Sequence, residues 1–243
     1  HTGKMTTQKQ LLEEFKKKFG VRVVVGGERY DMDVAYNIAD EEKAAEYIES
    51  FLSAELSIYS PNALKGSRIS SIVLCKNLAS WGKKVSGLAD LRWTGFTWFL
   101  GNQFFVDVER PFDAFTRKVI HHELYHLIDS ADDFNGLYDN NWKKLNKPDF
   151  TYKDDLLVNQ TAEQKPARGF ISTYAMQAVE EDKAEVFSHM IVDYNGFEKA
   201  TKGDVILRRK MDRMKELMKA FCDHFDETFW KERMKASVHL ERY

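Results

Sequence analysis

Apolar residues recur at helical spacing in several stretches of this chain. In four stretches, apolar side chains lie three and four positions apart among charged ones. These stretches are residues 6–19, residues 178–192, and two that start near Asp40 and near Asp204. This is the pattern of a helix with one buried face. The stretch from Asp204 is also basic on its polar side, and we expect that side to face solvent while the apolar stripe packs on the domain.

Short apolar runs rich in β-branched or aromatic residues predict three strands. They occupy residues 21–25, 69–74 and 103–108, and glycines or polar residues border them. All three predicted strands lie in the first half of the chain, and the elements predicted after residue 130 are helices. The sequence therefore predicts a mixed α+β protein whose C-terminal part is mostly helical.

The last predicted strand directly precedes a further predicted helix, which we expect to run from Pro111 to about Ser130. Proline is tolerated in the first turn of a helix, where its missing N–H has no partner to lose. We expect this strand to have an exposed edge, along Phe104–Val108, to which an extended peptide binds as an additional strand. Phe105, Val106 and Asp107 are then candidate substrate-binding residues. The alternative is that these aromatic side chains fill the core.

The helix that follows contains the motif His122-Glu123-x-x-His126. Histidines four residues apart lie one turn apart on the same face, so both imidazoles can reach one metal ion. Glu123 emerges beside them, where its carboxylate can accept a proton from a metal-activated water. The motif is short and arises by chance in surface helices. Here its flanks are apolar, which indicates a buried helix in which histidines and a glutamate need partners.

A catalytic zinc ion usually has three protein ligands, so a third ligand must lie elsewhere. Asp132 is one candidate, because metzincins place a third histidine six residues after the second. However, Asp129 stands where that class has the glycine that lets the chain turn back. The other candidates are Glu181 and Glu185, four apart on one face of a later helix. One of these acids can bind zinc while the other holds a ligand histidine, and spacing does not choose between them.

Two segments resemble the catalytic domain of anthrax toxin lethal factor and its relatives, which are gluzincin zinc peptidases. The first segment, from His122 to Asp129, is similar to the active-site helix of that family. The second is Ser172-Thr173-Tyr174-Ala175 followed by Glu180-Glu181-Asp182-Lys183-Ala184-Glu185-Val186-Phe187. The resemblance covers roughly residues 115–190 and does not extend to elements that select a substrate.

This resemblance implies particular roles for residues in both segments. Glu181 is expected to be the third zinc ligand, and Glu185 is expected to support a ligand histidine. The phenol of Tyr174 is expected to help stabilise the oxyanion of the tetrahedral intermediate. Asp129, three residues after His126, can orient a ligand histidine or cap the end of its helix. Relatives of this kind are often exported toxins or effectors, which favours secretion, with a cytoplasmic location as the alternative.

Composition excludes several other classes of protein. The net charge of -2 comes from acids and bases mixed along the chain, which argues against a nucleic-acid partner. There is no run of 18 apolar residues, so we expect no membrane span. Two cysteines are too few for a disulfide framework. None of these features predicts an oligomeric state.

Together these patterns predict a single zincin-like domain over residues 1–243, with an α/β part at about 6–130 and a helical part at about 131–243. We expect a small mixed sheet over the active-site helix, with His122, His126 and Glu181 binding Zn2+. The predicted activity is endopeptidase hydrolysis of a protein or peptide, with Glu123 as general base. Two alternatives are an inactive zincin-fold binding module and a metal-dependent amidase that acts on a non-peptide amide.

Overall fold

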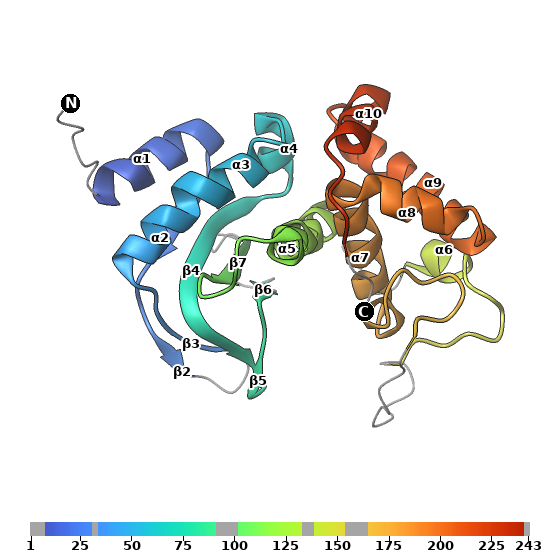
Figure 1. Cartoon of the computed structure of the whole chain (residues 1–243), viewed down its shortest axis with the longest axis horizontal. Coiled ribbons are helices and arrows are strands. Elements are labelled where there is room, and N and C mark those ends of the chain that lie inside the picture. The colour runs from blue at the N-terminus through green and yellow to red at the C-terminus, as the bar shows by residue number, and fades with distance from the viewer. Residues whose placement is uncertain (1–7, 31–33, 91–101, 133–138, 154–164, 241–243) are drawn as a thin grey trace. The chain divides into compact units, whose positions relative to one another are not determined.

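The computed structural model describes residues 8–30, 34–90, 102–132, 139–153 and 165–240 (Figure 1). The chain divides into two compact units, His1–Thr116 and Arg117–Tyr243. The sequence predicts the change from the α/β part to the helical part later, at about residue 130. The boundary falls earlier because side chains of the metal-motif helix, such as Lys118 and Tyr125, contact residues of the C-terminal helices.

Five helical elements lie among the described residues of the first unit. The bounds are α1 Gln8–Phe19, α2 Glu41–Tyr47, the π-helical turn η1 Ile48–Leu52, α3 Ser53–Leu56 and α4 Pro61–Gly66. Phe15 and Phe19 form the buried face of α1, and Gly20 ends this helix with a φ of 71°, a conformation that glycine adopts at little cost. The helices predicted at residues 6–19 and from near Asp40 are confirmed.

The strands of the first unit form one mixed sheet. Their bounds are β1 Arg22–Val25, β2 Arg29–Tyr30, β3 Ala35–Ile38, β4 Ile69–Ser80, β5 Lys83–Lys84, β6 Gly87–Asp90 and β7 Asn102–Asp107. The order is β2-β3-β4-β7-β6, with β1 and β5 also paired to β4. The long strand β4 runs parallel to β1 and β7 and antiparallel to β3 and β5. All three predicted strands are present, although β4 continues six residues beyond Leu74.

The prediction of an exposed edge at β7 is wrong. This strand pairs with β4 on one side and with β6 on the other, so its backbone groups already have partners. Phe105 and Val106 are buried, and Phe105 packs in a core cluster with Val73 and neighbouring residues. Asp107 accepts hydrogen bonds from the backbone N–H groups of Leu78 and Glu109. A peptide therefore has no free backbone edge at Phe105, Val106 and Asp107 to which it can add.

The second unit is mostly helical, as predicted. Its elements are α5 Ala114–Asp132, which starts at the end of the first unit, α6 Asn140–Lys143, the 3-10 turn η4 Tyr174–Met176, α7 Val179–Val192, α8 Tyr194–Thr201, α9 Val205–Phe221 and α10 Glu227–Lys235. Helix α5 starts three residues later than predicted, because the Asp113 carboxylate accepts a hydrogen bond from Thr116 N and so caps this end. Helices α6, α8 and α10 were not predicted.

Helix α7 lies at the centre of the second unit. It contacts α8, α9, α10 and η4, and every residue from Asp182 to Val192 is buried. The ring of Phe187 packs against Tyr125 of α5 and Phe225, which follows α9. Within the described parts of the chain, no helix has the length and apolar composition needed to cross a membrane.

Candidate metal centre

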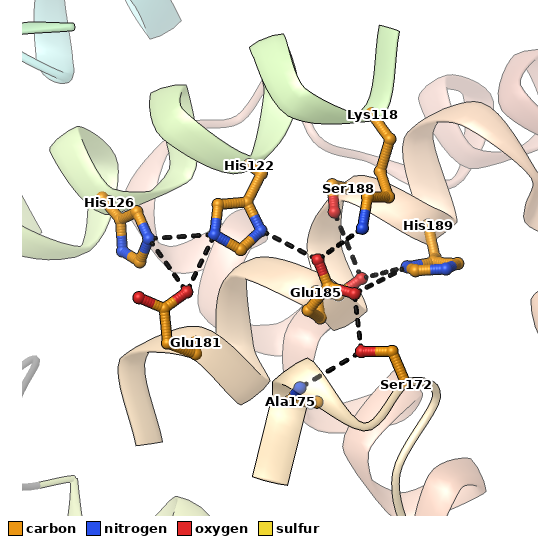
Figure 2. A network of polar contacts seen from close by, with 9 residues as sticks. All are labelled: Lys118, His122, His126, Ser172, Ala175, Glu181, Glu185, Ser188 and His189. Atoms are coloured by element: carbon orange, nitrogen blue, oxygen red, sulfur yellow. Dashed lines mark hydrogen bonds and ion pairs between the residues drawn. The ribbon is translucent and has the colours of Figure 1, made fainter. Parts of the chain in front are cut away.

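Three potential metal ligands converge between α5 and α7. The Nε2 atoms of His122 and His126 lie 3.1 Å apart, as their spacing of one helical turn predicts. Glu181 reaches them from α7, with its Oε2 atom 2.9 Å from His122 Nε2 and 3.5 Å from His126 Nε2 (Figure 2). Both histidines are buried and Glu181 is partly buried. The described residues thus offer two imidazoles and one carboxylate to a common point.

The donor set fits a zinc ion. Zinc bonds of about 2.0–2.1 Å in a tetrahedral site separate neighbouring ligand atoms by about 3.3 Å. The three separations observed here, 2.9, 3.1 and 3.5 Å, lie around that value. Two histidines and one glutamate are also a ligand set that catalytic zinc sites use.

Electrostatics favours a cation at this point. Burial lowers the pKa of His122, but hydrogen bonds to Glu181 and Glu185 outweigh it and raise that pKa to about 10. Burial also raises the pKa of Glu181, yet the positive charge of the nearby histidines brings it below its ordinary range. The carboxylate thus stays ionised, and positive charge beside it is stabilised. A divalent ion supplies that charge in place of the protons, so metal binding is expected to release protons.

Glu185 faces the opposite side of the His122 ring. Its Oε1 atom lies 3.1 Å from His122 Nδ1 and accepts a hydrogen bond of 2.7 Å from Lys118 Nζ. Its Oε2 atom accepts a hydrogen bond of 2.7 Å from Ser172 Oγ. A proton on His122 Nδ1 that is held by Glu185 leaves the Nε2 lone pair free for a metal. The two acids therefore have different positions. Glu181 faces the Nε2 atoms that can bind a metal, and Glu185 contacts Nδ1 on the other side of the His122 ring.

The alternative third ligand, Asp132, requires the chain to turn back after His126 as it does in metzincins, and the chain does not turn there. Helix α5 continues through Asp129 to Asp132 without reversing direction. Six residues on, a helical position lies about 240° around the axis from His126, which is a different face. The side chain of Asp132 lies outside the described residues. Asp129 accepts a hydrogen bond from the buried Lys183 on α7, so this acid links α5 to α7.

Tyr174 and Glu123 lie close to the same point. The ring centroid of Tyr174 is 5.8 Å from that of His122, and 46% of the side chain is exposed. Partial burial, together with the negative charges of Glu181 and Glu123, raises the pKa of Tyr174 above its ordinary range. The phenol therefore stays protonated and can donate a hydrogen bond. Glu123 is buried, and its charge also raises the pKa values of both histidines.

Two of the side chains that hold Glu185, those of Lys118 and Ser172, were not predicted from the sequence. Lys118 lies four residues before His122, so its position on the same helical face was available as a signal. Ser172 was part of the resembling segment but had no expected role. His189, four residues after Glu185, donates from Nδ1 to the Glu185 carbonyl oxygen at 2.8 Å. Burial lowers the pKa of His189 to about 4, so this histidine is neutral and acts as a structural donor.

The chain matches a zinc-binding metallopeptidase family by sequence and a solved structure by fold. The family described as "Putative zinc-binding metallo-peptidase" matches residues 94–225, more than half of the chain, and the protein belongs to it. A crystal structure from Bacteroides caccae, titled as a "putative zinc-binding metallo-peptidase", is similar to this chain with a TM-score of 0.61. It shares 16% sequence identity, and the match covers 96% of this chain and 94% of that one. No curated protein matches the chain.

These comparisons confirm part of what the sequence predicted. The similar solved structure confirms the mixed α/β fold class. The family and the solved structure are both described as zinc-binding, in agreement with the predicted cofactor. Neither description names lethal factor, so that resemblance stays with the two sequence segments that carry it.

Proposed function

We propose that this protein is a zinc-dependent endopeptidase of the gluzincin type. The observation that carries the proposal is the convergence of His122 Nε2, His126 Nε2 and Glu181 Oε2, with Glu123 next to the first ligand on the same helix. In this proposal the two histidines and Glu181 hold the ion. The membership of a metallopeptidase family supports a peptidase over other zinc proteins.

The remaining residues suit the steps of peptide hydrolysis. Zinc, when bound, would act as a Lewis acid that polarises the scissile carbonyl and lowers the pKa of a water molecule. Glu123 would accept the proton of the attacking water at its carboxylate and then deliver it to the leaving amine. The protonated phenol of Tyr174 would donate a hydrogen bond to the developing oxyanion. The lethal factor resemblance independently favours the same roles for Glu181 and Tyr174.

Metal content is the first test of this proposal. Elemental mass spectrometry of the purified protein should find about one zinc per chain in the wild type, as three-ligand sites require. Glu181→Ala should retain much less zinc. Glu180→Ala, which removes the neighbouring acid of the same helix, is the matched control and should retain the wild-type amount. Equal zinc in wild type and Glu181→Ala would remove Glu181 from the ligand set.

Cleavage is the second test. Digestion of a peptide library by the zinc-loaded protein should give a repeatable preference around the cut bond, which an amidase for non-peptide substrates would lack. Glu123→Gln should abolish cleavage while the zinc content stays unchanged, because Glu123 handles protons and does not bind the metal. A wild-type protein that holds zinc but cleaves no peptide would favour the inactive binding module instead.

A further inference from the structure

Ser172 makes two hydrogen bonds that join different parts of the site (Figure 2). Its Oγ atom donates to Glu185 Oε2 at 2.7 Å and accepts from the backbone N of Ala175 at 3.1 Å. The serine is buried, and the Ala175 side chain is fully buried. A hydroxyl can donate and accept at the same time. This single group therefore links a carboxylate on α7 to the backbone of the preceding turn.

The turn in question carries Tyr174. It is the three-residue element η4, with backbone hydrogen bonds from Met176 N to Thr173 O at 3.2 Å and from Gln177 N to Tyr174 O at 3.1 Å. A single 3-10 turn is weak on its own, because few backbone bonds hold it. The bond from Ala175 N to Ser172 Oγ is an additional tie next to Tyr174. The position of the phenol is thus expected to depend on where the Ser172 hydroxyl is held.

Glu185 provides a fixed point for that hydroxyl. Only 1% of this residue is exposed, and its two oxygens serve different partners. Oε1 faces His122 Nδ1 and accepts from Lys118 Nζ, whereas Oε2 accepts from Ser172. The same carboxylate therefore orients a potential zinc ligand through one oxygen and the Tyr174 turn through the other.

We propose that Ser172 is a positioning residue that sets the Tyr174 hydroxyl relative to the zinc ligands through the carboxylate of Glu185. This inference rests on the proposed function, in which Tyr174 stabilises the oxyanion. Removal of the Ser172 hydroxyl leaves the contact of Glu185 Oε1 with His122 in place, so zinc is retained. It frees the Ala175 N–H, so the turn loses its tie to α7 and the phenol moves from its working position. A displacement of about 1 Å at a reacting group can lower the rate about a hundredfold.

The test uses the zinc-loaded full chain and three substitutions of Ser172. Ser172→Ala removes the hydroxyl, Ser172→Thr retains it, and Ser172→Cys keeps the size with a weaker hydrogen bond if the alanine variant does not fold. Ser188→Ala is the matched control, because Ser188 is a buried serine on α7 that donates to the backbone oxygen of Glu185 at 3.3 Å and not to its carboxylate.

Two readouts do not depend on peptidase activity. Amide hydrogen exchange at Ala175 should be at least about tenfold faster in Ser172→Ala than in the wild type and in Ser188→Ala, because the amide has lost its acceptor. Ser172→Thr should restore slow exchange, and Ser172→Cys should lie in between. The zinc dissociation constant of Ser172→Ala, from chelator competition, should stay within about twofold of the wild-type value, because the contact with His122 is intact.

The third readout is a double-mutant cycle on cleavage. Ser172→Ala should lower kcat by about ten- to a hundredfold with little change in KM. In a Tyr174→Phe background the same substitution should have almost no further effect, because the group that it positions is already gone. An equal loss of kcat in both backgrounds would show that Ser172 does not act through Tyr174 and would overturn the proposal.

The outcomes separate this proposal from the proposed function. Unchanged exchange at Ala175 in Ser172→Ala would overturn the positioning role, whatever the activity. A zinc-bound wild type that cleaves nothing, together with fast exchange at Ala175 in Ser172→Ala, would overturn the peptidase proposal and support the link from Glu185 to the Tyr174 turn. Loss of zinc in Ser172→Ala would also overturn the proposal, since the hydroxyl would then act through the metal ligands.

Discussion

The ammonium group of Lys210 on α9 lies 2.6 Å from Asp182 Oδ2 on α7, and neither side chain is exposed to solvent. The same oxygen accepts hydrogen bonds from Trp142 Nε1 at 2.8 Å and from the Tyr152 hydroxyl at 2.7 Å. Lys210 also donates to the carbonyl oxygen of Gly169 at 2.7 Å. This buried ion pair therefore holds α9, Trp142, Tyr152 and the backbone at Gly169 against α7, the helix that carries Glu181.

Removal of Asp182 is predicted to destabilise the protein strongly. Asp182→Ala leaves the Lys210 ammonium buried without its counter-ion, which costs roughly 3–5 kcal/mol in the free energy of unfolding. Urea unfolding measures the loss. The double variant Asp182→Leu with Lys210→Met should be more stable than Asp182→Ala, because no unpaired charge remains. In the exposed pair of Lys219 and Asp223, Asp223→Ala should have no measurable effect.

The carboxylate of Glu185 is predicted to strengthen zinc binding without touching the metal. Glu185→Gln should weaken zinc affinity by about ten- to a hundredfold, because His122 loses its charged partner at Nδ1. Chelator competition measures the dissociation constant. The conservative control is Glu185→Asp, which keeps the charge and should lose less affinity. Unchanged affinity in Glu185→Gln would show that the hydrogen bond to His122 has no influence on the ligand.

The phenol of Tyr174 is predicted to act only on the rate of cleavage. Tyr174→Phe should lower kcat by about a hundred- to a thousandfold, as loss of one oxyanion donor does, and zinc content should stay the same. Burial and the nearby carboxylates raise the pKa of Tyr174 above its ordinary value of 10.0 before zinc binds, so the phenol is protonated at neutral pH. A Tyr174→Phe variant that cleaves as fast as the wild type would contradict the predicted role.

The neutral His189 predicts a specific pH dependence of stability. Burial holds its folded pKa at about 4, whereas an unfolded histidine has a pKa of about 6.5. Below that value the unfolded chain takes up a proton that the folded protein does not bind. His189 therefore contributes fully to the free energy of unfolding above about pH 6.5. This contribution is lost as the pH falls towards 4, by up to about 1.4 kcal/mol per pH unit.

His189→Asn tests this pH dependence, because asparagine retains a donor for the Glu185 carbonyl oxygen but does not titrate. Urea unfolding of both chelator-treated proteins between pH 7 and 4 should show a shallower decline in the variant. Other titrating groups, including His122 and His126, are common to both proteins and cancel in the difference. Parallel curves would mean that His189 is charged in the folded state.

Gly169 is predicted to tolerate no side chain. Its φ is 98°, and an added Cβ would lie 2.7 Å from Ile206 Cγ2. Gly169→Ala therefore combines a strained backbone with a steric overlap. Gly20 has a φ of 71° with open space around it, so Gly20→Ala carries only the backbone strain, about 1–2 kcal/mol. Thermal unfolding should show a larger loss for Gly169→Ala. Equal losses would show that Ile206 moves aside freely.

The sequence predicted the helix faces of the site but not which side chains pair across them. Spacing of four places Lys118, His122 and His126 on one face of α5, and Glu181 with Glu185 on one face of α7. Periodicity contains no information about which position of one helix meets which position of the other. The separate roles of Glu181 and Glu185, left open by spacing, follow from tertiary packing, which sets one acid against Nε2 and the other against Nδ1.

The error at β7 has a similar cause. An apolar run predicts a buried strand, and the run at residues 103–108 is one, but the number of its neighbours depends on segments far along the chain. Its second neighbour, β6, is Gly87-Leu-Ala-Asp90, a sequence with weak strand propensity that pairing with β7 overrides. The extension of β4 beyond Leu74 arises in the same way, through its pairing with β3 and β5.

The burial of α7 also limits how this protein can change. From Asp182 to Val192 this helix presents no residue to solvent, so almost any replacement there disturbs either the core or a polar side chain with an assigned partner. The acid that faces the two histidines belongs to this same helix. We therefore expect few amino-acid substitutions to accumulate in α7 during evolution, including evolution towards a new substrate specificity. Most substitutions are expected in other segments of the chain.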